Sequence, residues 1–97
     1  MIECAWVYIL ASRRDGALYI GVTRDIGQRL YAHRHGLVEG FTRRYGINKL
    51  VHIERYDRLV EAIQREKQLK KWYRRWKVEL IEQDNPLWED LYDRVNM

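Results

Sequence analysis

Apolar residues recur along the chain in two kinds of pattern, and the first kind predicts strands. Short β-rich apolar runs occupy residues 7–10 and 18–22, and the polar segment between them contains Asp15-Gly16. Because Asp and Gly tolerate the positive φ angles of tight turns, we expect a β-hairpin over about residues 5–22. Residues 49–56 alternate between apolar and polar side chains well enough to predict a third strand.

The second pattern, apolar residues one helical turn apart, predicts a helix directly after the hairpin. This helix should cover about residues 25–35, with Thr23 or Asp25 as its N-cap and Gly36 as its stop signal. Residues 36–48 contain three glycines and are expected to form a loop or a broken element.

Three further helices are predicted in the second half of the chain. Asp57 is the expected N-cap of a helix that continues to about Lys71, and another helix should cover about residues 73–83. Asn85 and Pro86 suit the N-cap and the first position of a short final helix.

The element order β-β-α-β-α-α-α predicts an α+β fold with a small three-stranded, largely antiparallel sheet flanked by helices. At 97 residues, with 46% hydrophobic and 33% charged, residues 1–97 are expected to form a single globular domain. No apolar run approaches the ~20 residues that cross a bilayer, and the N-terminus lacks a basic secretion signal. We therefore expect no membrane partner and a cytoplasmic location. Cys4 alone cannot form an internal disulfide.

Charge is unevenly distributed along the chain. Residues 1–78 hold 17 Lys and Arg against 8 Asp and Glu, whereas residues 79–97 hold one Arg against six Asp and Glu. A basic body suits a polyanion, because Lys and Arg neutralise phosphates and release counterions. Arginine outnumbers lysine 13 to 5, which favours bidentate phosphate contacts. Nucleic acid is the expected partner, and an ordinary solvated surface is the alternative.

One acidic residue lies where the predicted helix after Asp57 should be apolar. Five residues gather on a single face of that helix, namely Leu59, Ala62, Ile63, Leu69 and Tyr73. Glu66 falls in the middle of that face, about 20° from Leu59 on the helical wheel. A carboxylate that faces a core is costly unless it is paired or binds a cation.

The first predicted helix carries possible partners for this carboxylate. Arg29 and His33 lie one turn apart, on or beside the inner side of the helix. In one interpretation, Arg29 forms a structural ion pair with Glu66. In the other, Arg29 clamps a phosphate, His33 assists, and Glu66 holds one Mg²⁺ that keeps its waters. The residues alone leave both interpretations open.

Aromatic residues also admit two interpretations. Tyr8 and Tyr19 belong to the two strands of the hairpin and are expected to stand close together, either as core residues or with hydroxyls on a phosphate. Residues 65–77 interleave seven basic residues with three aromatic ones, a combination that can bind a nucleic-acid backbone and stack on bases. We favour core packing for these aromatics and substrate binding for some of the charges: Lys67, Lys70 and Lys71.

Together these residues resemble the GIY-YIG nuclease superfamily. The resemblance rests on Trp6-Val7-Tyr8, then Tyr19-Ile20-Gly21, then Arg29 and Glu66, in this order and on the expected elements. The tracts GFTRRYGINKLV, AIQREKQLKKW and NPLWEDLY are similar to small stand-alone bacterial members of the excinuclease-like type, which share their domain with the incision enzyme of bacterial excision repair. The likeness covers nearly the whole chain.

The resemblance implies roles for the matching residues. Arg29 would hold the scissile phosphate and stabilise its developing charge. Glu66 would be the only protein ligand of a single Mg²⁺ or Mn²⁺. Gly21 would let the backbone pass close to the substrate. One of the motif tyrosines, Tyr8 or Tyr19, would orient or deprotonate the attacking water.

The general base is left open by one departure from the family pattern. Some relatives carry a lysine directly after the YIG motif, and this chain has Val22 there. The remaining candidates are Tyr8, Tyr19 and His33, which matches a histidine that several members carry one turn after the arginine.

The implied function is a metal-dependent endonuclease that hydrolyses phosphodiester bonds in DNA, with structure-selective cutting and a link to DNA repair or recombination as finer expectations. One alternative is a non-catalytic or weakly catalytic nucleic-acid-binding module. Another is a subunit that requires a protein partner, docked through the acidic C-terminal segment with Trp88 and Tyr92, although these aromatics can instead pack on the domain.

Overall fold

The computed structural model describes residues 4–37 and 40–95, and its centre is a three-stranded sheet. The strands are β1 (Ala5–Ala11), β2 (Leu18–Thr23) and β3 (Lys49–Tyr56), in the order β2-β1-β3. β1 and β2 form the predicted hairpin, and β3 pairs antiparallel with the other side of β1. The predicted fold class is confirmed.

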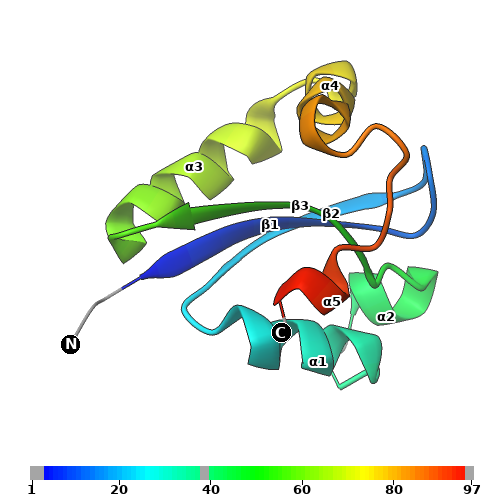
Figure 1. Ribbon diagram of the computed structural model, residues 1–97, viewed down its shortest axis with the longest axis horizontal. Coiled ribbons are helices and arrows are strands. Elements are labelled where there is room, and N and C mark those ends of the chain that lie inside the picture. The colour runs from blue at the N-terminus through cyan, green and yellow to red at the C-terminus, as the bar shows by residue number, and fades with distance from the viewer. Residues whose placement is uncertain (1–3, 38–39, 96–97) are drawn as a thin grey trace.

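Helices cover both faces of this sheet (Figure 1). The upper face in that view carries α3 (Leu59–Lys71) and α4 (Arg74–Asp84), and the lower face carries α1 (Ile26–Arg34), α2 (Phe41–Tyr45) and α5 (Tyr92–Val95). Among the described residues, no helix combines the length and the apolar character needed to cross a membrane.

β1 is the middle strand and is buried on both faces, which explains its continuous apolar run. Val7 and Ile9 belong to the core under α3 and α4, whereas Tyr8 and Leu10 belong to the core on the α1 side. Successive side chains of one strand therefore line two separate cores.

Local signals place the hairpin turn and α1 as predicted. Asp15 adopts a φ of 59°, and a Cβ at Gly16 would overlap the side chains of its own turn. Asp25 caps α1, because its Oδ1 accepts a 3.1 Å hydrogen bond from the backbone N–H of Gln28. Gly36, directly after the C-cap residue, has a φ of 66°.

Two predictions in the middle of the chain need correction. Asp57 does not cap α3. It forms an exposed 2.9 Å ion pair with Arg55, and the helix follows Arg58, whose side chain makes no capping hydrogen bond. The glycine-containing stretch 36–48, predicted as a loop or broken element, includes the short helix α2, which ends at a left-handed Gly46 with φ 63°.

The predicted final helix at Pro86 is also wrong. Asn85 closes α4, and its buried amide donates hydrogen bonds of 3.2 and 2.8 Å to two backbone oxygens. Trp88 follows with a φ of 57°, is fully buried, and donates a 2.7 Å hydrogen bond to Glu82. The last helix begins only at Tyr92. Trp88 therefore packs on the domain and offers no surface to a protein partner.

Candidate active site

The two motif tyrosines lie side by side on the α1 face of the hairpin. Tyr8 pairs with Gly21 across the strands, and Leu10 pairs with Tyr19, so the tyrosines are diagonal neighbours. Their ring centroids are 6.3 Å apart. Tyr8 is fully buried and Tyr19 is half-buried. The predicted proximity of the two rings is confirmed.

Gly21 gives the ring of Tyr8 its space. A Cβ at position 21 would overlap Cζ and Oη of Tyr8, well inside van der Waals contact. Any side chain there would displace the ring of Tyr8, which is fully buried and packed against its neighbours. The packing of Tyr8 therefore explains why position 21 is a glycine. The predicted close approach of the backbone to the substrate stays a prediction.

His33, in the last turn of α1, lies against both tyrosines. Its Nε2 is 3.2 Å from Tyr8 Oη, and its Nδ1 is 3.2 Å from Oγ1 of Thr42 in α2. The imidazole centroid lies 5.9 Å from the ring of Tyr8 and 5.4 Å from that of Tyr19. Thr42 is buried, and it was not identified as a site residue from the sequence. Its place between Gly40 and Gly46 was the only available signal.

Arg29 lies one turn before His33, close enough to Tyr8 to influence its hydroxyl. Its side chain is half-buried. Within residues 4–37 and 40–95, it forms no ion pair with a carboxylate. A partly desolvated guanidinium without a counter-charge is chemically suited to an anion.

Burial fixes the protonation of this group at neutral pH. Burial, and secondarily Tyr19, raises the pKa of Tyr8 to about 12, although Arg29 acts in the opposite direction. Burial and the charge of Arg29 lower the pKa of His33. The pair is therefore a phenol and a neutral imidazole. In one tautomer Nε2 accepts the phenolic proton while Nδ1–H donates to Thr42.

Glu66 is the predicted site residue that this group does not include. As the helical wheel predicts, it faces inward from α3, with its side chain 16% exposed between the buried Ala62 and Leu69. However, α3 and α1 cover opposite faces of the sheet (Figure 1). Among the described residues, Glu66 pairs with Lys70 at 3.3 Å and not with Arg29. The structural Arg29–Glu66 ion pair is therefore not formed.

The site offers few protein ligands for a hard divalent cation. The described part of the chain holds no group of three or more His, Cys, Asp or Glu residues that could enclose a metal ion. Glu66 offers one carboxylate, and α3 packs on β1 and on the edge strand β2. A single carboxylate suits Mg²⁺ or Mn²⁺, which complete their coordination with waters and substrate oxygens.

The lysines predicted to bind substrate lie on the outer side of the same helix. Lys67, Lys70 and Lys71 are exposed. Lys70 is the ion-pair partner of Glu66, so it is one turn from the candidate metal ligand. Their contact with substrate stays a prediction.

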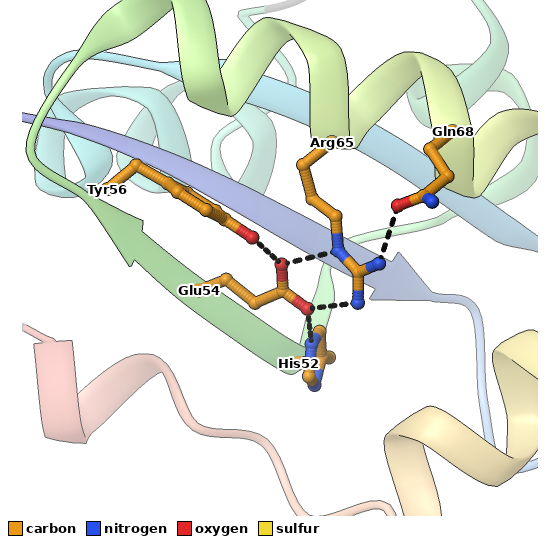
Figure 2. A network of polar contacts seen from close by, with 5 residues as sticks. All are labelled: His52, Glu54, Tyr56, Arg65 and Gln68. Carbon is orange, nitrogen blue, oxygen red and sulfur yellow. Dashed lines mark hydrogen bonds and ion pairs between the residues drawn. The ribbon is translucent and has the colours of Figure 1, made fainter.

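A second polar cluster, which the sequence reasoning missed, lies between β3 and α3 (Figure 2). Arg65 donates hydrogen bonds of 2.9 and 3.1 Å to the two carboxylate oxygens of Glu54. Tyr56 donates to Glu54 at 2.7 Å, and His52 Nε2 lies 2.9 Å from the same carboxylate. Arg65 also donates to Gln68 at 2.8 Å. We call these five residues the Glu54 network.

The charges of the Glu54 network balance within it. Burial alone would raise the pKa of Glu54, but hydrogen bonds from His52, Arg65 and Tyr56 outweigh it and lower the pKa to about 2. Burial and Glu54 raise the pKa of Tyr56 to about 12. A carboxylate with this many donors is a structural anchor that fastens α3 to β3. The alternation of residues 52, 54 and 56 on one strand face was the available signal.

Comparison with known proteins yields related matches to a family model and to individual proteins. A family model described as the GIY-YIG catalytic domain matches residues 4–79. The chain is 35% identical over 92 residues to a UPF0213 protein of Clostridium perfringens, covering 95% of this chain and 98% of that one. It is 40% identical over 80 residues to a UPF0213 protein of Syntrophus aciditrophicus, covering 81% and 91%.

A solved structure is also similar. The solution NMR structure of a UPF0213 protein from Bacillus halodurans is 31% identical, with a TM-score of 0.57, over 90% of this chain and 92% of that one. The matches therefore extend over both sequence and fold. The family match spans every candidate residue from Tyr8 to Glu66 and ends before Trp88.

Proposed function

The chain belongs to the GIY-YIG family of nuclease catalytic domains, and we propose that it is itself an endonuclease that hydrolyses phosphodiester bonds in DNA with one Mg²⁺ or Mn²⁺. One observation carries this proposal: Arg29, with no carboxylate partner among the described residues, lies beside the buried Tyr8–His33 pair. A phosphodiester would bring the counter-charge to a group that can also move a proton. We further propose that residues 1–97 act as one catalytic domain in DNA repair or recombination.

Arg29 would bind the scissile phosphate and stabilise the charge that develops on its oxygens. A guanidinium presents a fork of N–H donors that matches two phosphate oxygens. Since Arg29 is half-buried and held one turn from His33, it needs little reorganisation when charge develops.

His33 would be the final proton acceptor. Tyr8 is fully buried, so we assign the contact with the attacking water to the half-buried Tyr19. The water proton would pass through the hydroxyls of Tyr19 and Tyr8 to Nε2 of His33, while Nδ1–H stays on Thr42. With a pKa of about 12, Tyr8 is a poor base by itself but a suitable relay to the neutral imidazole.

Glu66 would hold the metal ion through its single carboxylate. When bound, the ion would supply Lewis-acid chemistry, polarising the phosphate and stabilising the leaving oxygen. β2 is an edge strand that α3 packs against and that carries Tyr19. We propose that groups from the two faces of the sheet approach one phosphate at this edge.

The test is cleavage of supercoiled and branched DNA with Mg²⁺ or Mn²⁺. We expect the wild type to cut and the Glu66→Gln variant, or the wild type in EDTA, to lose cutting. Glu61→Gln is the matched control, because Glu61 is an exposed carboxylate on the same helix. Wild-type cutting no faster than that of Glu66→Gln would refute the catalytic proposal.

A nucleic-acid-binding module that does not cut is the second candidate. It is favoured by one observation, the pairing of Glu66 with Lys70 on the face of the sheet away from Arg29. This candidate predicts salt-sensitive DNA binding that survives Glu66→Gln, with no cutting by any variant.

A further inference from the structure

Two aromatic rings at the junction of α3 and α4 are exposed rather than buried. Tyr73 is 65% exposed and Trp76 is 41% exposed, although both were predicted to pack in the core. The prediction assumed that the apolar face of α3 continues, whereas the helix ends at Lys71. Trp72 and Tyr73 are then extended, with ψ angles of 149°. The break turns Tyr73 out of the helical phase that would have buried it.

The exposed rings form a small platform. The centroids of Tyr73 and Trp76 are 4.8 Å apart, and the ring planes are nearly perpendicular at 76°. Trp72, which is half-buried, contacts Trp76 edge-on at 6.1 Å and anchors it. Isolated exposed apolar residues are normal on a protein surface, but two adjacent large rings held against each other offer flat faces to a ligand.

Most charges around the platform are basic, and Glu79, which lies beside Trp76, is the acidic exception. Residues 70–77 contain five basic residues and no acidic one. The guanidinium carbon of Arg75 lies 5.6 Å from the centroid of Tyr73. Within the described residues, neither Arg75 nor Lys71 forms an ion pair. Flat aromatic faces surrounded by unpaired cations are complementary to nucleotides, which combine bases with phosphates.

Structural roles account for only part of this basic cluster. Arg74 donates hydrogen bonds of 2.9 and 2.7 Å to the backbone oxygens of Asp15 and Gly16, so it fastens α4 to the hairpin turn. Arg75 and Lys77, in contrast, lie near the N-terminus of α4, where the helix dipole favours acidic side chains. Helix stability therefore does not explain them.

We propose that Tyr73 and Trp76, with Arg75 and Lys71, form a stacking platform for unpaired nucleotides of the nucleic-acid substrate. The rings would stack on bases, and the two cations would bind the adjoining phosphates. Binding of this kind tolerates any sequence, because every base has a π-face.

The platform lies within reach of the proposed catalytic residues. Tyr73 follows Glu66 by seven residues: five along α3, a rise of about 8 Å, and then the extended Trp72 and Tyr73. This inference rests on the proposed function for its substrate and adds a preference for DNA with single-stranded character near the cut.

The test is the affinity for a short fluorescein-labelled oligodeoxyadenylate, measured by anisotropy in EDTA so that no cutting occurs. We expect Tyr73→Ala and Trp76→Ala to bind about tenfold to a hundredfold more weakly than the wild type, the range of one base–aromatic stack. Tyr73→Phe should bind as the wild type does, because stacking needs the ring and not the hydroxyl.

Two controls separate stacking from charge and from misfolding. Tyr31→Ala is the matched variant, since Tyr31 is a 51% exposed tyrosine on α1, away from the basic cluster. It should bind normally. An abasic oligomer of equal length keeps the phosphates but has no bases, so wild type and Tyr73→Ala should bind it equally weakly. Unfolding curves confirm that each variant is folded.

Equal binding of the oligodeoxyadenylate by wild type, Tyr73→Ala and Trp76→Ala would overturn the platform, even if the enzyme cuts DNA. So would a wild-type dimer in sedimentation that Trp76→Ala converts to a monomer, because the rings would then cover a second copy of the chain. Conversely, ring-dependent binding without metal-dependent cutting would leave the platform intact and refute the nuclease proposal.

Discussion

Two polar clusters lie on opposite faces of the same sheet, and they differ in whether their charges are satisfied. The Glu54 network contains one carboxylate and one guanidinium that bond to each other twice. The group of Tyr8, His33 and Arg29 contains a guanidinium and, among the described residues, no carboxylate partner for it. A closed network stabilises the fold, whereas a group with one uncompensated charge is suited to an external anion.

Removing the uncompensated charge of Arg29 should have the largest effect, and that effect should be on catalysis. Arg29→Ala should lower kcat for DNA cleavage roughly 10³-fold, because it removes the charge that stabilises the transition state. Stability to urea should change little, since no folded-state ion pair is lost. Loss of folding in step with loss of activity would place Arg29 with the structural residues instead.

The matching change in the closed network should affect stability first. Arg65→Ala should lower the free energy of unfolding by about 3 kcal/mol, because Glu54 is left half-buried without its charged partner. Arg55→Ala, which breaks the exposed pair with Asp57, is the control and should cost less than about 1 kcal/mol. Urea unfolding monitored by tryptophan fluorescence measures both. Equal costs would show that the network contributes no more than a surface pair.

Lowering the pH should destabilise the fold by protonating Glu54. Glu54 has its pKa lowered from 4.5 to about 2, so its stabilising contribution is complete above about pH 4.5. As the pH falls from there toward 2, the unfolded chain takes up the proton first, and about 2–3 kcal/mol of stability is lost. Urea unfolding across this range, with Glu54→Gln alongside, isolates the contribution. A Glu54→Gln variant with the same acid-dependent loss would assign that loss to other carboxyl groups.

The smallest expected effect comes from the support of His33. Thr42→Val removes the side-chain oxygen 3.2 Å from Nδ1, so the imidazole is less firmly held in the tautomer that accepts a proton at Nε2. We expect kcat to fall about tenfold, less than the roughly 10²-fold or larger loss expected when a general base is removed, and Thr42→Ser to restore it. Unchanged kcat in Thr42→Val would remove this hydrogen bond from the proposed proton path.

The sequence predicted well the features that depend on neighbours along the chain. The hairpin, the Asp25 cap and the proximity of Tyr8 and Tyr19 follow from turn residues, capping chemistry and the period of a strand, all of which act over a few residues. The inward position of Glu66 follows from the helical period in the same way.

The failures occur where distant segments meet or where a period is interrupted. Tyr73 was assigned to the face of a helix that ends two residues earlier. Trp88 was placed on a helix because Asn85-Pro86 is a good starting pair, but the amide of Asn85 donates to the backbone oxygens of Val51 in β3 and of Glu89. Thr42 and the Glu54 network depend on which side chains two elements present to each other, and no short-range rule specifies that.

The buried position of Trp88 has a practical consequence for shortening this chain. The family match ends at residue 79, yet Ile81 and Trp88 are fully buried in the core under α3 and α4. Asn85, which bends the chain so that Trp88 can enter that core, also lies beyond the match. A chain shortened to the matched region would leave a large hole in the core and expose apolar surface, and we expect it to aggregate. We therefore expect residues 4–79, which match the family model, to be too short to fold without the segment that contains Ile81 and Trp88.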